Sequence, residues 1–194
     1  MFTGIIEAMG IITDVSVERS NKRFTIESPL SDELKIDQSV SHNGVCLTVV
    51  DLTTNSHTVV AVDETLTKSN LGALRAGDKI NLERCMLSNG RFDGHIVQGH
   101  VDQVGRVKFI REAGGSWLFT FEYDPSKGNV TVEKGSIAVN GVSLTCFNST
   151  ADNFTIAIIP YTFEHTNFHL LKIGDTVNLE FDIIGKYVKR LLQQ

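Results

Sequence analysis

Leu74-Arg75-Ala76-Gly77-Asp78-Lys79-Ile80-Asn81-Leu82-Glu83 occurs a second time, 97 residues later, as Leu171-Lys172-Ile173-Gly174-Asp175-Thr176-Val177-Asn178-Leu179-Glu180, and six of these ten pairs are identical. At the same offset, Asn43-Gly44-Val45-Cys46-Leu47-Thr48 returns as Asn140-Gly141-Val142-Ser143-Leu144-Thr145. Near the start, Gly4-Ile5-Ile6-Glu7 matches Gly99-His100-Val101-Asp102 at an offset of 95. Such an offset is too long for a solenoid repeat and fits two copies of one small domain. We therefore predict two equivalent halves, able to hold two similar ligands.

The composition is that of an ordinary globular protein, since 41% of the 194 residues are hydrophobic and 21% are charged. The net charge is -5 and no run of lysines or arginines occurs, which disfavours a nucleic-acid-binding surface. No apolar run approaches the length of a membrane span, and the start of the sequence lacks the pattern of a signal peptide. The three cysteines, an odd number without close pairs, favour reduced thiols. We expect a cytoplasmic protein without nucleic-acid or membrane partners.

Each half contains several short segments with the pattern of β-strands. Alternation with a period of two is typical of strands, and so are runs rich in β-branched and aromatic residues. Closure into a barrel removes exposed strand edges, so we expect a small antiparallel barrel in each half, although periodicity alone does not separate a barrel from a sandwich. The expected limits are 1–94 for the first barrel and 95–185 for the second. The strand-like segments include 23–27, 57–62, 79–83, 117–123, 154–159 and 177–181.

The segment 186–194 predicts a short C-terminal helix. Tyr187, Val188, Leu191 and Leu192 form one apolar face at helical spacing. A helix of this length is marginal by itself in water, so it must pack on another surface. Its own barrel and a second subunit both remain open as that surface.

Several groups of residues recur in a known order and spacing: MFTGIIE at 1–7, the two Asn-Gly-Val-x-Leu-Thr blocks, GHIVQGHVD at 94–102, IPYT at 159–162 and NLEFD at 178–182. Together they resemble the riboflavin synthases of the alpha-chain type, which are lumazine-binding proteins. The resemblance runs from Met1 to about Leu192, nearly the whole chain. No one group is decisive, but their order, spacing and duplication together are highly specific.

The resemblance implies an all-β fold of two similar Greek-key barrels, each of six antiparallel strands, and a C-terminal helix that helps to build a homotrimer. It implies a transferase that acts on two molecules of 6,7-dimethyl-8-ribityllumazine in the last step of riboflavin biosynthesis. One molecule gives a four-carbon unit to the other, and the products are riboflavin and 5-amino-6-ribitylaminouracil. In such trimers the first barrel of one subunit meets the second barrel of the next. No cofactor or metal is implied, and lumazine synthase is a candidate further partner.

Positions that are equivalent in the two halves are candidates for binding, because both substrates are the same molecule. Gly4 and Gly99 allow close approach of the backbone to a flat ring. Paired threonines offer hydroxyl groups, although a lone threonine in a strand usually reflects β-propensity. The resemblance places Gly4, Ile5, Ile6, Cys46, Leu47, Thr48, Val60, Ala61, Val62, Asp63, Glu64 and Thr65 around the first ligand, and Gly99, His100, Val101, Lys134, Ser143, Leu144, Thr145, Ile158, Ile159, Pro160, Tyr161, Thr162 and Phe163 around the second.

Positions that differ between the halves are candidates for chemistry, because the donor and acceptor molecules must behave differently. Cys46 matches Ser143, and a thiol and a hydroxyl differ in acidity and nucleophilicity. His100 matches Ile5, and its imidazole can take a proton from a lumazine methyl group. The further catalytic candidates are Asp182, Lys134 and Ser39; the first two match Cys85 and Asp37, whereas Ser39 is paired with Ser136.

Other histidines and cysteines are interpreted as structural. His95 lies five residues before His100, and odd spacing along a strand would place the two on opposite faces. Cys85 and Cys146 are assigned to packing. His165 and His169 are four residues apart but lack the surrounding motif of a metal site.

Two rival functions stay open at this stage. A non-catalytic relative that holds lumazine or flavin as a fluorophore would be expected to lose the reactive residues or one pocket. A flavin-binding barrel of a reductase would need a nicotinamide-binding unit, and no glycine-rich strand-turn-helix motif follows.

Overall fold

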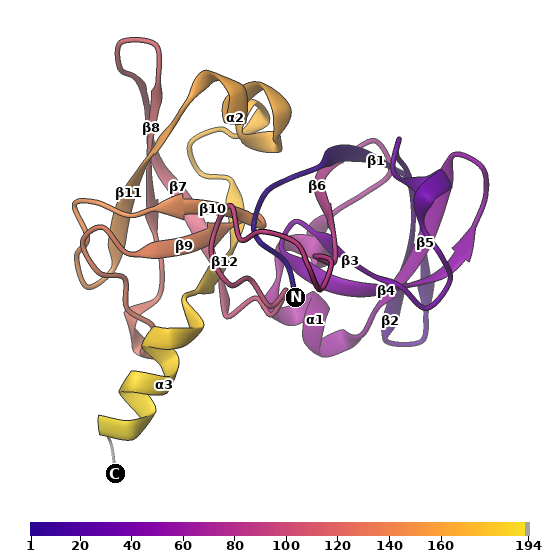
Figure 1. The fold of residues 1–194 in the computed structure, drawn as a ribbon, viewed down its shortest axis with the longest axis horizontal. Coiled ribbons are helices and arrows are strands. Elements are labelled where there is room, and N and C mark those ends of the chain that lie inside the picture. The colour runs from indigo at the N-terminus through magenta and orange to yellow at the C-terminus, as the bar shows by residue number, and fades with distance from the viewer. Residues whose placement is uncertain (193–194) are drawn as a thin grey trace.

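The computed structural model describes residues 1–192, and its first half is a closed antiparallel barrel (Figure 1). Around the barrel the strands run in the order β1-β2-β5-β4-β3-β6. The strands β3, β4 and β5 follow one another as hairpins, and β6 returns to lie between β3 and β1, which is a Greek-key arrangement. The bounds are β1 Ala8–Glu18, β2 Asn21–Glu27, β3 Ser39–His42, β4 Val45–Leu52, β5 Ser56–Ala61 and β6 Lys79–Arg84.

The second half repeats this topology in an antiparallel sheet of order β10-β9-β12-β7-β8-β11. The prediction of two similar six-stranded units is confirmed, with one difference in closure. Strand β10 has four residues where β4 has eight, and Asn148 lies beyond it in the left-handed conformation, with φ 48°. Only the isolated bridge Phe147–Thr155 joins the β10 side to β11 within the described residues. The bounds are β7 Gln103–Glu112, β8 Trp117–Glu122, β9 Ser136–Val139, β10 Val142–Thr145, β11 Asn153–Ile158 and β12 Thr176–Phe181.

Each half has its own apolar core, as the alternating strand patterns require. The first core is mainly aliphatic. The second contains five phenylalanines, and the rings of Phe119 and Phe168 meet edge to face at 5.2 Å. Short helices and turns connect the strands: α1 Asp63–Lys68, α2 Pro160–His165, and the 3-10 turns η1 Ser31–Glu33, η2 Asn70–Ala73, η3 Pro125–Lys127 and η4 Asn167–Leu170.

The C-terminal helix, α3 (Ile183–Leu192), extends away from the second half (Figure 1). It begins three residues earlier than the predicted helix, whose last two positions, Gln193 and Gln194, lie outside the described residues. Lys189 reaches back to the Gly128 carbonyl oxygen, but most apolar residues of the helix, from Ile184 to Leu192, are exposed to solvent. Across residues 1–192, no helix has the length and apolar character needed to span a membrane.

Six buried asparagines join the two halves through a nearly symmetric network. Within each half, the backbone N–H of Asn81 donates to Asn43 Oδ1, and that of Asn178 donates to Asn140 Oδ1, both at 2.8 Å. Between the halves, Asn81 Nδ2 donates to the Asn140 carbonyl at 3.0 Å, and Asn178 Nδ2 to the Asn43 carbonyl at 2.9 Å. The third pair is Asn70 and Asn167. The repeated Asn-Gly blocks thus form the joint between the halves.

Candidate functional site: two pockets that exchange segments

Two pockets occupy equivalent places in the two halves, and each is lined by residues from both blocks of the repeat. The N pocket, about 300 Å³, contains Cys46 of β4 and Thr65 of α1. The C pocket, about 520 Å³, contains their counterparts Ser143 and Thr162. The remaining lining is Val45, Glu64, Lys68, Ser69, Gly99, His100 and Val101 in the N pocket, and Ile5, Asp93, Gly94, Lys134, Ser136, Leu144, Thr145, Phe147, Ala157, Ile158 and Ile159 in the C pocket.

The segments before β1 and β7 cross to the opposite half. The Cys46 N–H donates to the Gly99 carbonyl at 2.9 Å, and the Ser143 N–H donates to the Gly4 carbonyl at 2.8 Å. Val101 packs against the first core, whereas Ile6 packs against the second. The expected grouping, with Gly4-Ile5-Ile6 in the first pocket and Gly99-His100-Val101 in the second, was therefore wrong. A repeat shows that two segments are equivalent, but it carries no signal for which copy each segment joins.

Both crossing glycines are required by their surroundings. Gly4 has φ 80° and Gly99 has φ 83°, a left-handed conformation that side chains disfavour. A Cβ on Gly99 would lie 2.5 Å from Cys46 Cβ, and one on Gly4 would lie 2.6 Å from Ser143 Cβ. The glycines therefore let the crossing segments pack directly against Cys46 and Ser143, a matched pair in which a thiol stands opposite a hydroxyl.

His95, which the sequence analysis interpreted as structural, contacts the C-pocket residue Ser143. Its ring Nδ1 lies 2.6 Å from Ser143 Oγ, and its backbone N–H donates to the Thr3 carbonyl. The prediction assumed a strand through 95–100, but that stretch is an irregular connection between β6 and β7. Burial lowers the pKa of His95, and the charge of Asp182 opposes this effect. A neutral imidazole beside a hydroxyl can accept or relay a proton at the C pocket.

Cys46 offers a protonated thiol in the N pocket. Burial raises its pKa, and the Ser39 hydroxyl opposes the rise. The thiol is therefore a hydrogen-bond donor near neutral pH and needs a base before it can act as a nucleophile. His100 lies exposed in the same pocket.

Lys134 and Asp182 line different cavities of the second half. Lys134 lines the C pocket from a left-handed backbone conformation, φ 64°, with its Nζ 5.6 Å from the centroid of the Phe147 ring. Asp182 lies between β12 and α3, accepts the Ile184 N–H at 3.0 Å, and lines a separate cavity of about 210 Å³ beside α3. Lys134 therefore lies in the wall of the C pocket. Asp182 lies outside that wall and acts near it only through the effect of its charge on the pKa of His95.

The other predicted binding residues divide between pocket walls and core. Thr145, Leu144, Ile158, Ile159 and Thr162 line the C pocket, and Glu64 lines the N pocket. Leu47 and Ala61 are buried in the first core. Phe163 stacks on Trp117 at 3.8 Å, and Tyr161 stacks on His165 at 4.1 Å. The remaining predicted residues, Thr48, Val60, Val62, Asp63 and Pro160, are at least partly exposed outside both pocket linings.

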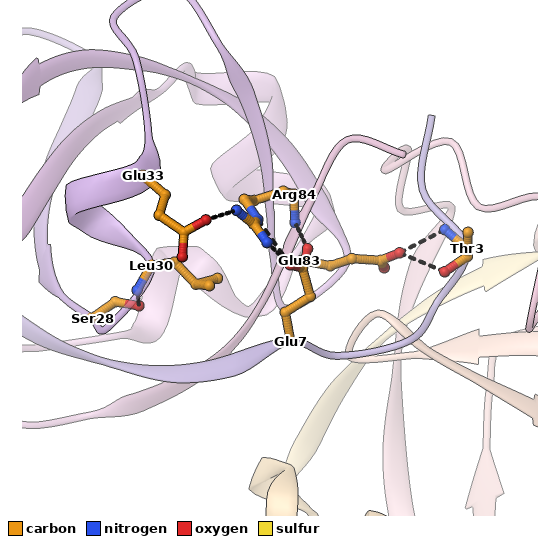
Figure 2. Close-up of polar contacts among 7 residues, drawn as sticks. All are labelled: Thr3, Glu7, Ser28, Leu30, Glu33, Glu83 and Arg84. Carbon is orange, nitrogen blue, oxygen red and sulfur yellow. Dashed lines mark hydrogen bonds and ion pairs between the residues drawn. The ribbon is translucent and has the colours of Figure 1, made fainter. Parts of the chain in front are cut away.

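A larger cavity of about 810 Å³ lies beside β6, but it differs from the N and C pockets in the residues of its wall. Its most prominent side chain, Arg84, is already paired with Glu7 and Glu33, each at 2.6 Å (Figure 2). The repeated threonines and the Cys46–Ser143 pair are not in its wall. We therefore place the functional site in the N and C pockets.

Comparison with known proteins agrees with the duplication. A family model described as the lumazine binding domain matches residues 3–85 and again residues 98–182. Riboflavin synthase of Bacillus subtilis (strain 168) is 43% identical over 100% of this chain and 91% of its own length. Riboflavin synthase of Schizosaccharomyces pombe is 40% identical over 100% of this chain and 94% of its own length.

A solved structure shares the fold. LumP complexed with 6,7-dimethyl-8-(1'-D-ribityl) lumazine matches with a TM-score of 0.84, covering 93% of this chain and 98% of that one, at 24% identity. This likeness supports the architecture alone. The family model fits both halves, and the full-length relatives share about two residues in five with the chain, so it belongs to the lumazine-binding family.

Proposed function

We propose that this chain is a riboflavin synthase, a transferase that converts two molecules of 6,7-dimethyl-8-ribityllumazine into riboflavin and 5-amino-6-ribitylaminouracil. The observation that carries the proposal is the pair of equivalent pockets that differ at reactive positions, among them Cys46 against Ser143 and His100 against Ile5. Such a pair suits a reaction between two copies of one molecule that play different roles. The riboflavin synthases that the chain resembles over its whole length support it.

The proposed roles follow from where the side chains lie. Thr65 and Thr162 offer hydroxyls to the ligands, and the crossing glycines let a flat ring approach the backbone. His95 and Ser143 hold or relay the proton removed from a lumazine methyl group. Lys134 stabilises the carbanion that this proton removal leaves. Cys46 and His100 act on the molecule in the N pocket.

The two pockets share no lining residue, so ligands bound within one chain are separated. Direct transfer of a four-carbon unit needs the two molecules in contact. We propose that the N pocket of one subunit faces the C pocket of another in a homotrimer, with α3 contributing to the assembly. A cytoplasmic location and a complex with lumazine synthase remain predictions.

The test is incubation of the purified protein with 6,7-dimethyl-8-ribityllumazine alone. Formation of equal amounts of riboflavin and 5-amino-6-ribitylaminouracil, without added reductant or metal, is expected. Binding of the lumazine without turnover would instead indicate a non-catalytic lumazine carrier. A requirement for a nicotinamide would contradict both.

A further inference from the structure

Two glutamates at equivalent positions of the repeat are buried with their carboxylates turned away from their own barrel cores. Glu83 ends the repeated block in β6, and Glu180 ends it in β12; each is 3% exposed. Neither is in the wall of the N or C pocket. A buried carboxylate is costly unless hydrogen bonds satisfy it, so their partners are informative.

Glu180, which belongs to the second half, binds the segment that completes the N pocket. Its Oε1 accepts the Gln98 N–H at 2.6 Å, and its Oε2 accepts the Gly99 N–H at 2.9 Å and the His100 N–H at 2.8 Å. The Gly99 carbonyl in turn accepts the Cys46 N–H. The Glu180 carboxylate thus binds His100 directly. It is linked to Cys46 through the peptide group between Gly99 and His100.

Glu83, which belongs to the first half, does the same for the C pocket. It accepts the Thr3 N–H at 2.7 Å, the Thr3 hydroxyl at 2.8 Å and the Gly4 N–H at 3.0 Å, and Figure 2 shows it reaching Thr3. The Gly4 carbonyl accepts the Ser143 N–H, and the Thr3 carbonyl accepts the His95 N–H. Both members of the His95–Ser143 pair therefore contact the segment that Glu83 holds.

We propose that Glu83 and Glu180 are a crossed pair of positioning residues, each anchored in one half and fixing the segment that completes the pocket of the other half. Removing the Glu180 charge will disturb the N pocket, and removing the Glu83 charge will disturb the C pocket. The proposed function is needed only to regard these pockets as substrate sites.

A carboxylate suits this task better than any neutral side chain. Two oxygens accept three donors at each site, and hydrogen bonds to a charged acceptor are shorter and stronger than neutral ones. Burial raises the pKa of both carboxyl groups, and the amide donors oppose that rise. Glutamine would offer one oxygen and turn an NH2 group toward backbone N–H donors, leaving at least one buried donor unpaired.

The test uses two reporters that do not depend on turnover. Alkylation of Cys46 by iodoacetamide, followed by mass spectrometry of its peptide, reports on the N pocket. The pKa of the His95 imidazole, followed by NMR of selectively labelled histidine, reports on the C pocket. The variants are Glu180→Gln, Glu83→Gln and the control Glu112→Gln, which lies exposed at the end of β7.

We expect Glu180→Gln to change the Cys46 alkylation rate by about tenfold, the equivalent of one charge-assisted hydrogen bond, and to leave the His95 pKa in place. Glu83→Gln should move the His95 pKa toward its ordinary value and leave Cys46 alkylation unchanged. Glu112→Gln should alter neither. If each variant disturbs the pocket of its own half, or both variants disturb both pockets equally, the proposal is overturned.

The aspartate variants keep the test decisive if a glutamine variant does not fold. Glu180→Asp and Glu83→Asp retain both oxygens on a shorter stem, so each should show the same crossed pattern with a smaller change. Absence of any change at either reporter in folded aspartate and glutamine variants would also overturn the proposal. If both reporters change in the crossed pattern while riboflavin formation is unaffected, the result counts against the proposed function of the pockets, not against the anchoring.

Discussion

His42 and His57 form a buried pair that exists only in the first half. Their Nε2 atoms are 2.9 Å apart, so one ring donates and the other accepts. His42 Nδ1 contacts the Val40 carbonyl and His57 Nδ1 contacts Ser31 Oγ, each at 3.0 Å. Burial lowers the pKa of His42 to about 3 and that of His57 to about 4, so both rings are neutral in the folded protein.

This pair predicts that the protein loses stability in mild acid. Because each folded-state pKa lies below the ordinary 6.5, the unfolded chain binds more protons as pH falls, and stability present above pH 6.5 is lost toward pH 4. The free energy of unfolding should fall by about 2–4 kcal/mol between about pH 6.5 and about pH 5. Urea unfolding at several pH values measures this.

The repeat supplies the matched control for that prediction. The equivalent positions in the second half hold Val139 and Phe154, both fully buried. The double variant His42→Val with His57→Phe should lose most of the pH dependence in this range. An equally steep acid loss in that variant would show that other groups cause it.

His95 should contribute to turnover more than to binding. His95→Gln removes the imidazole that contacts Ser143 Oγ, and a lost proton-transfer group lowers the rate by about 100-fold or more. Since burial lowers its pKa, the wild-type rate should persist somewhat below pH 6.5 before it falls. Steady-state kinetics together with the lumazine dissociation constant separate the two effects. His165→Gln, outside both pockets, should behave as wild type; equal loss in both variants would contradict the assignment.

At the level of elements, α3 exposes apolar side chains that a lone chain leaves in water. Ile184, Tyr187, Val188, Leu191 and Leu192 are all more than half exposed. Burying one such side chain stabilises an interface by about 1.5–3 kcal/mol. Leu191→Asp should therefore weaken the proposed homotrimer, as measured by analytical ultracentrifugation over a range of concentrations. Val17→Asp makes the same change at an exposed site of β1 and should have no effect; an unchanged oligomer in Leu191→Asp would exclude α3 from the interface.

The elements themselves were largely predictable, because alternating patterns and turn residues are local signals. The two halves, their strand content and the C-terminal helix follow from such signals. The crossing of the segments around Gly4 and Gly99 could not be predicted. The repeat shows that the two segments are equivalent, and this holds whether each segment joins its own half or the other half. The contact between His95 and Ser143 also escaped prediction, because the connection that carries His95 is irregular and lacks periodicity. The contacts of Gln98 and Thr3 with the two glutamates were also not predicted, because both use backbone N–H groups and the Thr3 hydroxyl adds to them without a motif.

At the scale of the whole molecule, the asparagine network should make the halves unfold together. Asn178 accepts the Asn70 N–H and donates to Asn43 and Asn70, so Asn178→Ala leaves several buried groups unpaired. The expected loss is about 1–3 kcal/mol, with a broadened or split transition in calorimetry. Asn55→Ala, at an exposed position, should change neither. A single sharp transition of unchanged midpoint in Asn178→Ala would show that other contacts couple the halves.

The missing strand ladder between β10 and β11 means that the walls of the two pockets should open locally at different rates. Strand β4 has ladder partners on both sides, in β3 and β5, whereas β10 has a ladder partner only in β9. A strand held on one side opens at lower free energy than one held on both. The pairing differs beyond these strands' shared first part: residues 49–52 form a ladder with β5, whereas residues 146–149 have, within the described chain, only the bridge of Phe147, a C-pocket residue, to Thr155. The amides of residues 146–149 should therefore exchange with deuterium faster than those of residues 49–52. A molecule in the C pocket would then bind and dissociate faster than a molecule in the N pocket.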